Sequence, residues 1–546
     1  MTRFCACEKL SGVKSSHLGA VRVRRVTPPP IEAGSDLTAR YLEDAAHFPG
    51  GSTIGVIRPA SLEELAASLD SSEPVLAVGA QSSLTGGATP KGEVVLSTER
   101  LRQLQIAGDH VVADAGVTLQ SIQDALAPLG RWFPPVPTYL GATVGGAVST
   151  CAAGAATFKY GTVRAWVDAI TVVLAGGDVV EIARGQIMAS PDGSFDIETS
   201  SGVRHVTIPP IQMPDVPKRS AGYFAAPGMD LIDLFIGSEG TLGVIASARL
   251  RTVPRPAAVC RWLVPVASER SAIALAGELR HASHDTWATG EVNGIDVSAI
   301  EHLDARSLAL VREDGVDLRL HLTLPTDAGV VLLVEQELSA TALSSDLWTA
   351  LERARDPGAP DSAIARVCRT LDRHGALDHA EVALPSDQTR AAAFADLREA
   401  VPTAVNRRVA LARHQLDPQI SKTAADMIVP FDRFEEMMTV CRRLFAERGL
   451  DLAVWGHISD GNVHPNLIPR SYDDVIAGRE AILELGRSVI AMGGCPLAEH
   501  GVGRHPAKQA LLRLLYGADG VAAMRRVKRA LDPDGRLAPG VIFATQ

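Results

Sequence analysis

Three loops rich in glycine and hydroxyl side chains interrupt the first half of the chain, and each lies beside a short apolar run typical of a strand. They are GAQSSLTGG (79–87), a glycine cluster within 134–167, and FIGSEGTLGVI (235–245). Glycine allows a backbone to approach a ligand closely, and successive amides can surround an anionic group. Alone, the first loop is equally typical of a turn between strands. Three such loops together predict a large polar cofactor.

The sequence lacks the motifs of two common nucleotide sites. It contains neither a G-x-G-x-x-G that opens a helix nor a G-x-x-x-x-G-K-[ST], which argues against a Rossmann NAD site and a P-loop. Its 53 basic and 63 acidic residues give a formal charge of −10. Because there is no global basic field, we do not expect nucleic acid as a partner.

The segment AVWGHISDGNVHPNLI (453–468) predicts a hairpin that brings two histidines together. Asp460-Gly461 is a strong signal for a two-residue type I′ turn, which needs positive φ at both central positions. With that turn, His457 and His464 would oppose each other with Cβ atoms about 4.5–5.5 Å apart, close enough to share a zinc ion. The alternative is a solvent-facing histidine pair without a metal. Asn466 would lie on the same face.

The segment AEHGVGRHPAK (498–508) supplies candidates for a third ligand in the adjacent Glu499 and His500. Two histidines and one carboxylate leave an open coordination position, as in catalytic zinc sites. The two neighbours cannot both ligate one metal comfortably in an extended stretch, because successive side chains point to opposite faces. We therefore expect different roles for Glu499 and His500.

The order of the glycine loops resembles the flavin domain of the vanillyl-alcohol-oxidase family, also called the p-cresol methylhydroxylase (PCMH) type. The resemblance covers most of residues 50–255 and extends to the C-terminus. It implies that FAD binds with its pyrophosphate at the first loop. The implied FAD contacts are Gly79, Gln81, Ser82, Ser83, Gly86, Gly87, Gly141, Gly145, Gly146, Gly154, Gly161, Glu239, Gly243 and Ile245.

Two positions depart from that flavin pattern. Val78 stands where many relatives carry Arg, and Cys151 stands where many carry Asn. Both departures put individual flavin contacts in doubt and leave the cofactor itself in place. Covalent attachment of the flavin stays open, since His47 precedes the glycine pair at 50–51 but a lone histidine in a loop is weak evidence.

The pattern G-H-x-x-D-G-N-x-H-x-N followed by E-H-G is similar to that of the FAD-linked D-2-hydroxy acid dehydrogenases, including D-lactate and D-2-hydroxyglutarate dehydrogenases. The resemblance implies that His457, His464 and Glu499 bind a divalent metal, expected to be zinc. It also implies that His500 is the base. Implied substrate contacts are Asn466 and two cations in short matching segments, Arg398 and Lys422.

The function implied is oxidation of a D-2-hydroxy acid, first of all D-lactate, to the 2-keto acid by hydride transfer to flavin N5. Without NAD motifs or iron–sulfur cysteine runs, the electrons would pass to a quinone, a cytochrome or an electron-transfer flavoprotein. One alternative is a flavoenzyme like alkyl-glycerone-phosphate synthase, in which no net oxidation occurs. An alternative from another class is a zinc hydrolase without flavin.

The fold expected is α+β, with a PCMH-type FAD-binding domain, an α/β substrate (cap) domain and a C-terminal segment that closes the active site. The composition changes after Pro254-Arg255-Pro256, and histidine and glycine become denser near residue 450. The predicted divisions are an N-terminal arm (1–45), the FAD-binding domain (46–256), the substrate domain (257–450) and the C-terminal segment with the metal site (451–546).

Cysteine usage and hydropathy bear on the compartment. Seven scattered cysteines, an odd number, do not suggest a disulfide framework, and Cys5 and Cys7 lack a second pair at zinc-site spacing. No stretch approaches the ~18 apolar residues of a membrane helix. We expect a soluble cytoplasmic protein, and the sequence leaves open peripheral contact with the inner membrane and a homodimer.

Overall fold

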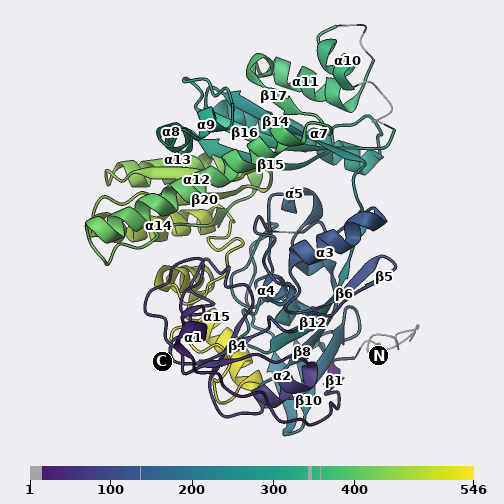
Figure 1. Cartoon of the computed structure of the whole chain (residues 1–546), viewed down its shortest axis with the longest axis vertical. Helices are drawn as coiled ribbons and strands as arrows, with labels where there is room; N and C mark the ends of the chain where they lie inside the picture. The colour runs from purple at the N-terminus through teal and green to yellow at the C-terminus, as the bar shows by residue number, and fades with distance from the viewer. Residues whose placement is uncertain (1–14, 136, 342–346, 357, 359, 546) are drawn as a thin grey trace.

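Two lobes, one above the other in Figure 1, make up the computed structural model of the chain. The lower lobe contains the first half of the chain, the upper lobe follows it, and the last helix returns to the lower lobe. The structure describes residues 15–135, 137–341, 347–356, 358 and 360–545.

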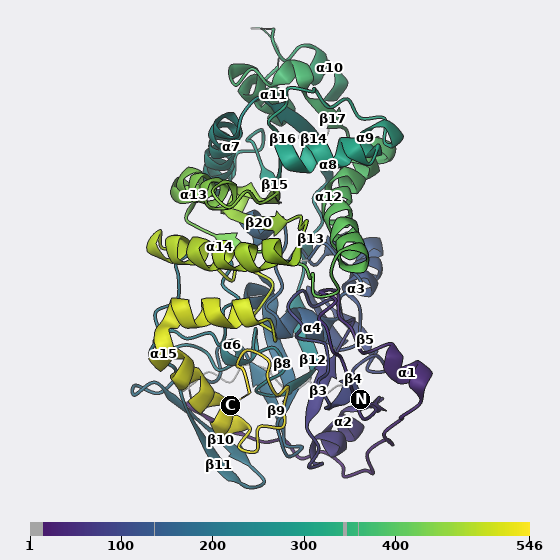
Figure 2. The ribbon, with the colours of Figure 1, turned by 90° about the vertical axis from the view of Figure 1, so that its left-hand side faces the viewer.

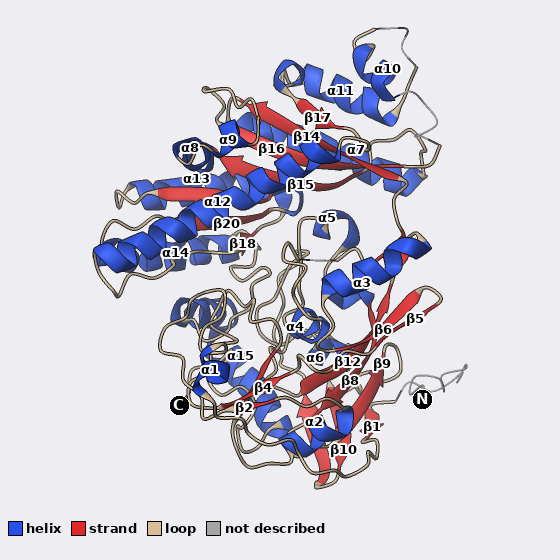
Figure 3. Cartoon of the chain, viewed as in Figure 1, coloured by secondary structure: helices blue, strands red, loops and turns tan. Residues whose placement is uncertain are grey.

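A parallel and an antiparallel sheet form the centre of the lower lobe (Figure 3). The parallel sheet has the order β2 (Val56–Ile57), β4 (Val94–Ser97), β3 (Val75–Val78). Its strands are almost continuously apolar and buried, as expected for a sheet covered on both faces. The antiparallel sheet has the order β5 (Leu104–Ala107), β6 (His110–Asp114), β12 (Val244–Arg251), β8 (Val167–Val173), β9 (Val179–Ala183).

Smaller sheets and short helices complete the lower lobe. A strand of the predicted arm, β1 (His17–Gly19), pairs in parallel with β10, so this part of the arm is attached to the lobe. The remaining strands are β7 (Arg131–Trp132), β10 (Ser194–Thr199), β11 (Gly202–Thr207) and β13 (Val253–Pro254). The helices are α1 (Ser35–Ala39), α2 (Leu62–Leu69), α3 (Leu119–Leu126), α4 (Val144–Ser149), α5 (Thr157–Tyr160) and α6 (Ile232–Phe235).

One seven-stranded antiparallel sheet forms the upper lobe, with helices on both faces (Figures 2 and 3). Its order is β17 (Glu381–Ala383), β14 (Ala258–Val266), β16 (Val330–Leu338), β15 (Val297–Asp304), β19 (Leu452–His457), β20 (Asn462–Leu467), β18 (Met427–Ile428). The helices are α7 (Glu269–Thr289), α8 (Ala305–Glu313), α9 (Val316–Arg319), α10 (Leu347–Glu352), α11 (Ala363–Arg373), α12 (Gln388–Gln415), α13 (Phe434–Ala446) and α14 (Tyr472–Ala491).

Alternation along the strands divides the apolar side chains between the two faces of this sheet. In β16, Val331 and Leu333 belong to the core that includes α8 and α12, whereas Leu332 and Val334 belong to the core that includes α7 and α13. This is the period of two that a strand imposes on its side chains. The sheet is therefore buried on both faces. The strands β19 and β20, which contain His457 and His464, lie toward the edge formed by β18.

The predicted boundary at residue 450 does not separate two structural units. It falls between α13 and β19, and β19 pairs directly with β15 in the middle of the upper sheet. Only the end of the chain leaves this lobe: α15 (Pro506–Leu531) is followed by Leu537, which pairs with Val75 of β3. The prediction relied on rising histidine and glycine content, which marks the chemistry of a site and not a break in the fold.

None of the described helices is long and apolar enough to cross a membrane. Five cysteines lie in the described ranges, and all five are buried and free of disulfide bonds: Cys151, Cys260, Cys368, Cys441 and Cys495. Cys5 and Cys7 lie outside the described residues.

We predict that Gly461, between β19 and β20, is required for the local backbone. Its φ is 85°, and an added Cβ would overlap the carbonyl oxygen of Val429. Gly493 is the matched control, because its φ is 81° but an added Cβ there meets no atom within 4 Å. Gly493→Ala should cost only the left-handed strain of about 1–2 kcal/mol. Gly461→Ala should lower the melting temperature more, and equal decreases in the two variants would contradict this account.

Candidate active site

The hairpin that carries the two histidines is buried and has a different turn from the predicted one. A 3-10 turn at Ile458–Asp460 and Gly461 in the left-handed region together connect the strands, so the loop has four residues. The predicted two-residue type I′ turn at 460–461 is therefore wrong. Ser459 explains the difference, because its hydroxyl accepts the backbone N–H of Ile300, and the turn is packed inside the protein instead of facing solvent.

The longer turn shifts the register but keeps the histidines together. His457 pairs with Asn462, and His464 pairs with Trp455, so the histidines are diagonal neighbours and not directly opposed. Their ring centroids are 5.4 Å apart, with the planes at 86°. Both side chains are buried, which contradicts the alternative of a solvent-facing pair.

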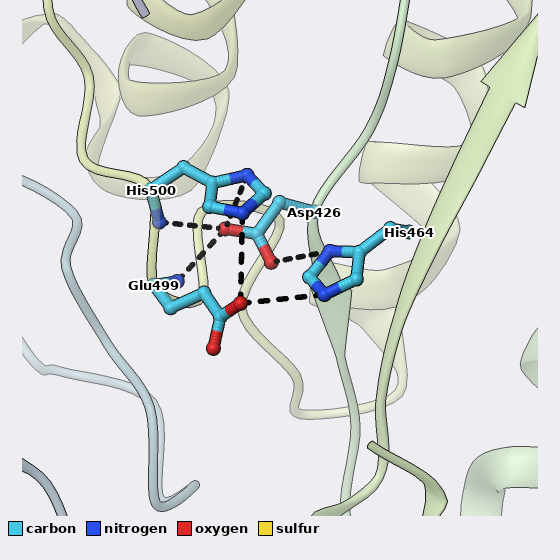
Figure 4. Close-up of side chains that lie close together, drawn as sticks. All are labelled: Asp426, His464, Glu499 and His500. Carbon is cyan, nitrogen blue, oxygen red and sulfur yellow. Dashed lines mark hydrogen bonds and ion pairs between the residues drawn. The ribbon is translucent and has the colours of Figure 1, made fainter. Parts of the chain in front are cut away.

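Three imidazole nitrogens surround one carboxylate oxygen of Glu499, and Figure 4 shows two of them. Glu499 Oε1 lies 3.5 Å from His457 Nε2, 3.3 Å from His464 Nε2 and 3.5 Å from His500 Nε2. Ligand atoms that share a tetrahedral zinc at about 2.0–2.1 Å are about 3.3–3.4 Å from one another. The distance from Glu499 Oε1 to each imidazole is therefore the one that two ligands of the same zinc ion would have.

Asp426, which the sequence did not predict, contacts His464, Glu499 and His500 (Figure 4). Its Oδ2 accepts the backbone N–H groups of Glu499 (2.8 Å) and His500 (2.9 Å). Its two oxygens also lie 3.5 Å from His464 Nδ1 and 3.6 Å from His500 Nδ1. A carboxylate that faces Nδ1 favours an imidazole orientation that leaves Nε2 for a ligand or a proton.

Asp426 also belongs to the group of possible metal ligands. Asp426, His464, Glu499 and His500 each offer a ligand atom within 4.8 Å of the others, and the predicted ligand His457 is not part of this group. Because both oxygens of Asp426 already accept hydrogen bonds, from the backbone and from Asn462, we assign it a positioning role. The set of His457, His464 and Glu499 stays a prediction, with His500 as the competing ligand.

Charge and burial set different protonation states for the two hairpin histidines. Burial lowers the pKa of His464 to about 4, so its imidazole is neutral, as a metal ligand must be. Burial also disfavours the charged form of His457, but Glu301 outweighs it and raises the pKa of His457 to about 9, so a metal bound at His457 would have to displace a proton. Glu301 Oε1 lies 2.7 Å from His457 Nδ1, so this carboxylate of β15 orients the second imidazole.

Lys218 is a fully buried cation beside Glu499, and the sequence reasoning missed it as well. Its Nζ lies 2.9 Å from Glu499 Oε2 and 3.1 Å from Asp460 Oδ2, and it donates a hydrogen bond to Asn462 Oδ1. Burial disfavours the ammonium, but the two carboxylates raise its pKa above the ordinary value. Lys218 thus holds Oε2 and leaves Oε1 of Glu499 facing the imidazoles.

A cavity of about 770 Å³ lies between the lobes and reaches from the glycine loops to the histidine group. Its volume is within the ~300–1,000 Å³ typical of ligand sites. Ten of the predicted FAD contacts line it: Gly79, Gln81, Ser82, Ser83, Gly87, Gly145, Gly146, Gly154, Glu239 and Ile245. Loops from distant parts of the lower lobe therefore converge on one wall, which is the arrangement that a long polar cofactor needs.

Four predicted FAD contacts do not line this cavity, and their surroundings suggest structural reasons for glycine. Gly86 (φ 76°) and Gly161 (φ 72°) adopt left-handed backbone angles. An added Cβ would meet the Tyr139 ring at Gly141 and a Val172 methyl at Gly243. His47, the candidate for covalent attachment, lines the cavity and pairs with Glu43 through a 3.1 Å contact.

Glu239 joins the glycine loops to the histidine group. It is a non-glycine residue at φ 52°, and its carboxylate accepts the N–H groups of Val502 and Gly503, both at 2.8 Å. Burial raises its pKa to about 7, and the two N–H donors limit the rise. The loop that carries Glu499 and His500 is therefore tied to the predicted cofactor site.

The predicted substrate contacts line the same cavity but differ in their partners. Arg398 lies 3.4 Å from Glu301 and 2.8 Å from Glu399, so two carboxylates already engage it. Lys422 has a pKa lowered to about 8 by burial, and no described residue forms an ion pair with it. Asn466 donates a hydrogen bond to the His464 carbonyl, and its own buried Oδ1 accepts none.

Comparison with known proteins gives two family matches that cover most of the chain. Residues 53–183 match the FAD binding domain, and residues 267–542 match the C-terminal domain of FAD linked oxidases. The second match spans half of the chain. The alternative of a hydrolase without flavin is contradicted by the match to an FAD-binding domain.

Individual proteins are similar over nearly the whole length. The glycolate oxidase subunit GlcD of Bacillus subtilis is 28% identical over 90% of this chain and 88% of its own. D-Lactate dehydrogenase of Archaeoglobus fulgidus is 26% identical over 89% of this chain and 90% of its own. The solved structure of an alkyldihydroxyacetonephosphate synthase has a TM-score of 0.58 at 12% identity, covering 97% of this chain and 89% of the other. That last similarity shows a shared fold.

We predict that Lys218→Met weakens metal binding by about 10–100-fold, the usual effect of removing a group that orients a ligand. Without its ammonium, Glu499 Oε2 loses its 2.9 Å partner and the carboxylate can turn away from the imidazoles. Metal content after equilibrium dialysis measures the effect, and Lys91→Met in the lower lobe is the control. If Lys218→Met fails to fold, the Lys218→Met/Asp460→Asn double variant removes one of the unpaired charges. Unchanged metal affinity in either variant would contradict the assignment.

A second prediction concerns the cofactor. The purified protein should contain about one FAD per chain. Gly79→Val should reduce its retention, because an added Cβ would overlap Thr143 Oγ1, the hydroxyl that caps α4. Gly34→Val is the control, since an added Cβ there meets no atom within 4 Å. Flavin absorbance per chain after gel filtration measures retention. A folded wild-type protein that cannot take up FAD would end this account.

Proposed function

The chain belongs to the family of FAD-linked oxidases, and we propose that it oxidises a D-2-hydroxy acid to the corresponding 2-keto acid. The observation that carries the proposal is the convergence of His457, His464 and His500 on one oxygen of Glu499. His464, Glu499 and His500 line a cavity whose other wall consists of the glycine loops. A 2-hydroxy acid in this cavity could therefore lose its hydroxyl proton on the histidine side and its C2 hydride on the side of the glycine loops.

His457, His464 and Glu499 are proposed to hold a divalent metal, and the glycine loops are proposed to hold FAD. When bound, the metal would lower the pKa of the substrate hydroxyl, and FAD would accept the hydride at N5. Lys218 and Glu301 keep the ligand atoms in position through Glu499 and His457. Asp460 shares Lys218 with Glu499 and so keeps this lysine between the two carboxylates.

His500 is the proposed base. Its side chain is 23% exposed, more than those of His457, His464 and Glu499, and it lines the cavity. Asp426 faces His500 Nδ1, which leaves Nε2 to take a proton from the substrate. His464 stacks on the His500 ring at 4.9 Å and restricts its rotation.

The substrate carboxylate is proposed to bind Lys422, with Asn466 and Arg398 near it. Lys422 is the cation of this group that no described carboxylate neutralises, and a buried ammonium gains most from an incoming anion. Asn466 Oδ1 is free to accept the substrate hydroxyl. Arg398 is restrained by Glu301 and Glu399, so it presents a fixed edge to the cavity.

D-Lactate is the reference substrate, since the Archaeoglobus relative is named as a D-lactate dehydrogenase. The metal is proposed to be zinc, which suits two imidazoles and a carboxylate. The electrons are proposed to leave for a quinone, a cytochrome or an electron-transfer flavoprotein. A cytoplasmic location with peripheral contact at the inner membrane, and a homodimer, stay as the accompanying proposals.

A reaction like that of alkyl-glycerone-phosphate synthase is the second candidate, because the fold is similar to that enzyme. No net oxidation would occur in such a reaction. The carboxylate of Glu499 among the histidines favours the dehydrogenase, because histidines with a carboxylate form a ligand set for a catalytic divalent metal. Lasting reduction of the flavin by a 2-hydroxy acid under anaerobic conditions separates the two candidates.

We predict that Glu499→Ala and His500→Ala fail in different ways. Glu499→Ala should lose metal and activity together. His500→Ala should keep metal and FAD but reduce the flavin about 10²- to 10⁴-fold more slowly, the usual contribution of a general base. Anaerobic stopped-flow spectroscopy with D-lactate measures the rate, and metal analysis runs in parallel.

The exposed His379, which lies away from the cavity, provides the control variant His379→Ala. It should match the wild type in rate and metal content. If His500→Ala loses the metal, His500 is a ligand and not the base. If His500→Ala reduces flavin at the wild-type rate, or if L-lactate is strongly preferred, the proposed base or stereochemistry is wrong.

A further inference from the structure

Besides the proposed carboxylate contacts, two cations line the cavity without an anionic partner. Arg479 of α14 and Lys508 of α15 lie in the same cavity wall as His464 and Glu499. Within the described part of the chain, no carboxylate forms an ion pair with either of them. Arg398, which lines the same cavity, differs from them because it has two carboxylate partners. An unpaired charge that is taken out of water costs free energy, so the buried Lys508 gains most from an anionic ligand, and the half-buried Arg479 lies in the same cavity.

Lys508 is the clearest case. The residue is only 6% exposed, and its Nζ is buried with no hydrogen-bond partner among the described residues. It lies in the first turn of α15, where the helix dipole disfavours a cation. Burial lowers its pKa, although Asp426 and Glu499 act in the opposite direction. The helix gains nothing from a lysine at this position, and the unpartnered Nζ at the cavity wall is available to bind an anion.

Arg479 approaches Lys508 from the neighbouring helix. Its guanidinium donates a 3.1 Å hydrogen bond to the Oγ of Ser421, the residue that precedes Lys422. This hydrogen bond restrains the Arg479 side chain. His505 lies close to both cations: burial first, and then the charges of Lys508 and Arg479, lower its pKa to about 4. Its neutral imidazole has a buried Nδ1 without a hydrogen-bond partner among the described atoms. Arg479, His505 and Lys508 form a cluster in which Lys508 Nζ and His505 Nδ1 have no hydrogen-bond partner among the described residues.

The cluster lies beside the metal centre. Lys508 is close enough to Asp426 and Glu499 for their charges to act on it, and Arg479 is held by the segment that leads to Asp426. Arg398, in contrast, contacts Glu301 on the His457 side. The cavity therefore contains Arg479 and Lys508 in addition to Lys422 and Arg398, and the single carboxylate of a monocarboxylic acid cannot neutralise all of them.

We propose that Arg479 and Lys508, assisted by His505, form a second anion site that binds an anionic group on the side chain of the substrate. The preferred substrate is then a D-2-hydroxy acid with a second carboxylate. This inference rests on the proposed function and refines it: an acid with a charged side chain is expected to be a better substrate than D-lactate. The anionic groups of FAD could bind to the same cations, and the experiment below distinguishes binding of FAD from binding of the substrate side chain.

The first test compares acids that differ in side-chain charge. Flavin reduction is followed with D-malate and D-2-hydroxyglutarate, and with the uncharged D-2-hydroxybutyrate and D-2-hydroxyvalerate. Removing one charge-assisted contact costs about 1.5–3 kcal/mol, which corresponds to a factor of about 10–150. We expect kcat/KM to be at least about tenfold higher for the charged acids.

The second test asks which residues cause this preference. Arg479→Met and Lys508→Met should each lower the ratio of kcat/KM between the charged and uncharged acids about tenfold or more, and Arg479→Lys should restore part of it. Arg487→Met is the matched control, because Arg487 lies on the exposed face of α14 and does not line the cavity. Its ratio should equal that of the wild type. Lys508→Met should melt no lower than the wild type without ligand, since it removes an unpaired buried charge.

The outcomes separate this inference from the function it rests on. If no D-2-hydroxy acid reduces the flavin, the proposed function itself fails. If D-lactate and the uncharged acids react as well as the dicarboxylic acids, only the second anion site is overturned. It is also overturned if Arg479→Met and Lys508→Met lose FAD while the FAD-bound fraction keeps the wild-type ratio, because the cations would then serve the cofactor.

Discussion

The arrangement of the site depends on the hydrogen bonds that the carboxylate of Asp426 accepts. It accepts two backbone N–H groups from the loop of Glu499 and His500, and a side-chain hydrogen bond from Asn462 at the start of β20. It also faces Nδ1 of His464 and of His500. One buried anion thereby joins the sheet edge to the loop, and the favourable interactions with the imidazoles keep its pKa well below the usual range despite burial.

A second carboxylate makes the connection to the other lobe. Glu239 belongs to a glycine loop of the lower lobe, and it accepts backbone N–H groups from Val502 and Gly503, two and three residues after His500. The residues proposed to hold the metal and those proposed to hold FAD are therefore connected through the same short loop. Hydride transfer requires atoms positioned to within a fraction of an ångström, and buried hydrogen-bonded connections of this kind provide that rigidity.

Local patterns in the sequence predicted the parts of the site whose residues are neighbours in the chain. His457, His464 and Glu499 could be identified because they lie in short segments with recognisable spacing, and the glycine loops could be identified by composition. The turn was predicted wrongly because Ser459 is bonded to β15, and a rule derived from solvent-exposed hairpins does not include such a contact.

The supporting charges carry no local signal at all. Lys218 reaches Asn462 across 244 residues, and Glu301 reaches His457 across 156. Asp426 stands as a single acidic residue in a largely apolar run, and Glu301 is followed by Asp304 in the same strand, features equally compatible with surface positions. Only the packing of the seven-stranded sheet brings them to the histidines, and so the fold had to be known before their roles could be assigned.

The most direct test of the central claim is a primary isotope effect on flavin reduction. The enzyme is mixed anaerobically with D-lactate or D-malate carrying either hydrogen or deuterium at C2, and bleaching of the oxidised flavin is followed. We expect the flavin to be reduced by the D acids and more slowly by the deuterated forms, because the C2 hydrogen is transferred as a hydride. Failure of both acids to bleach the flavin, or equal rates with hydrogen and deuterium, would contradict the account.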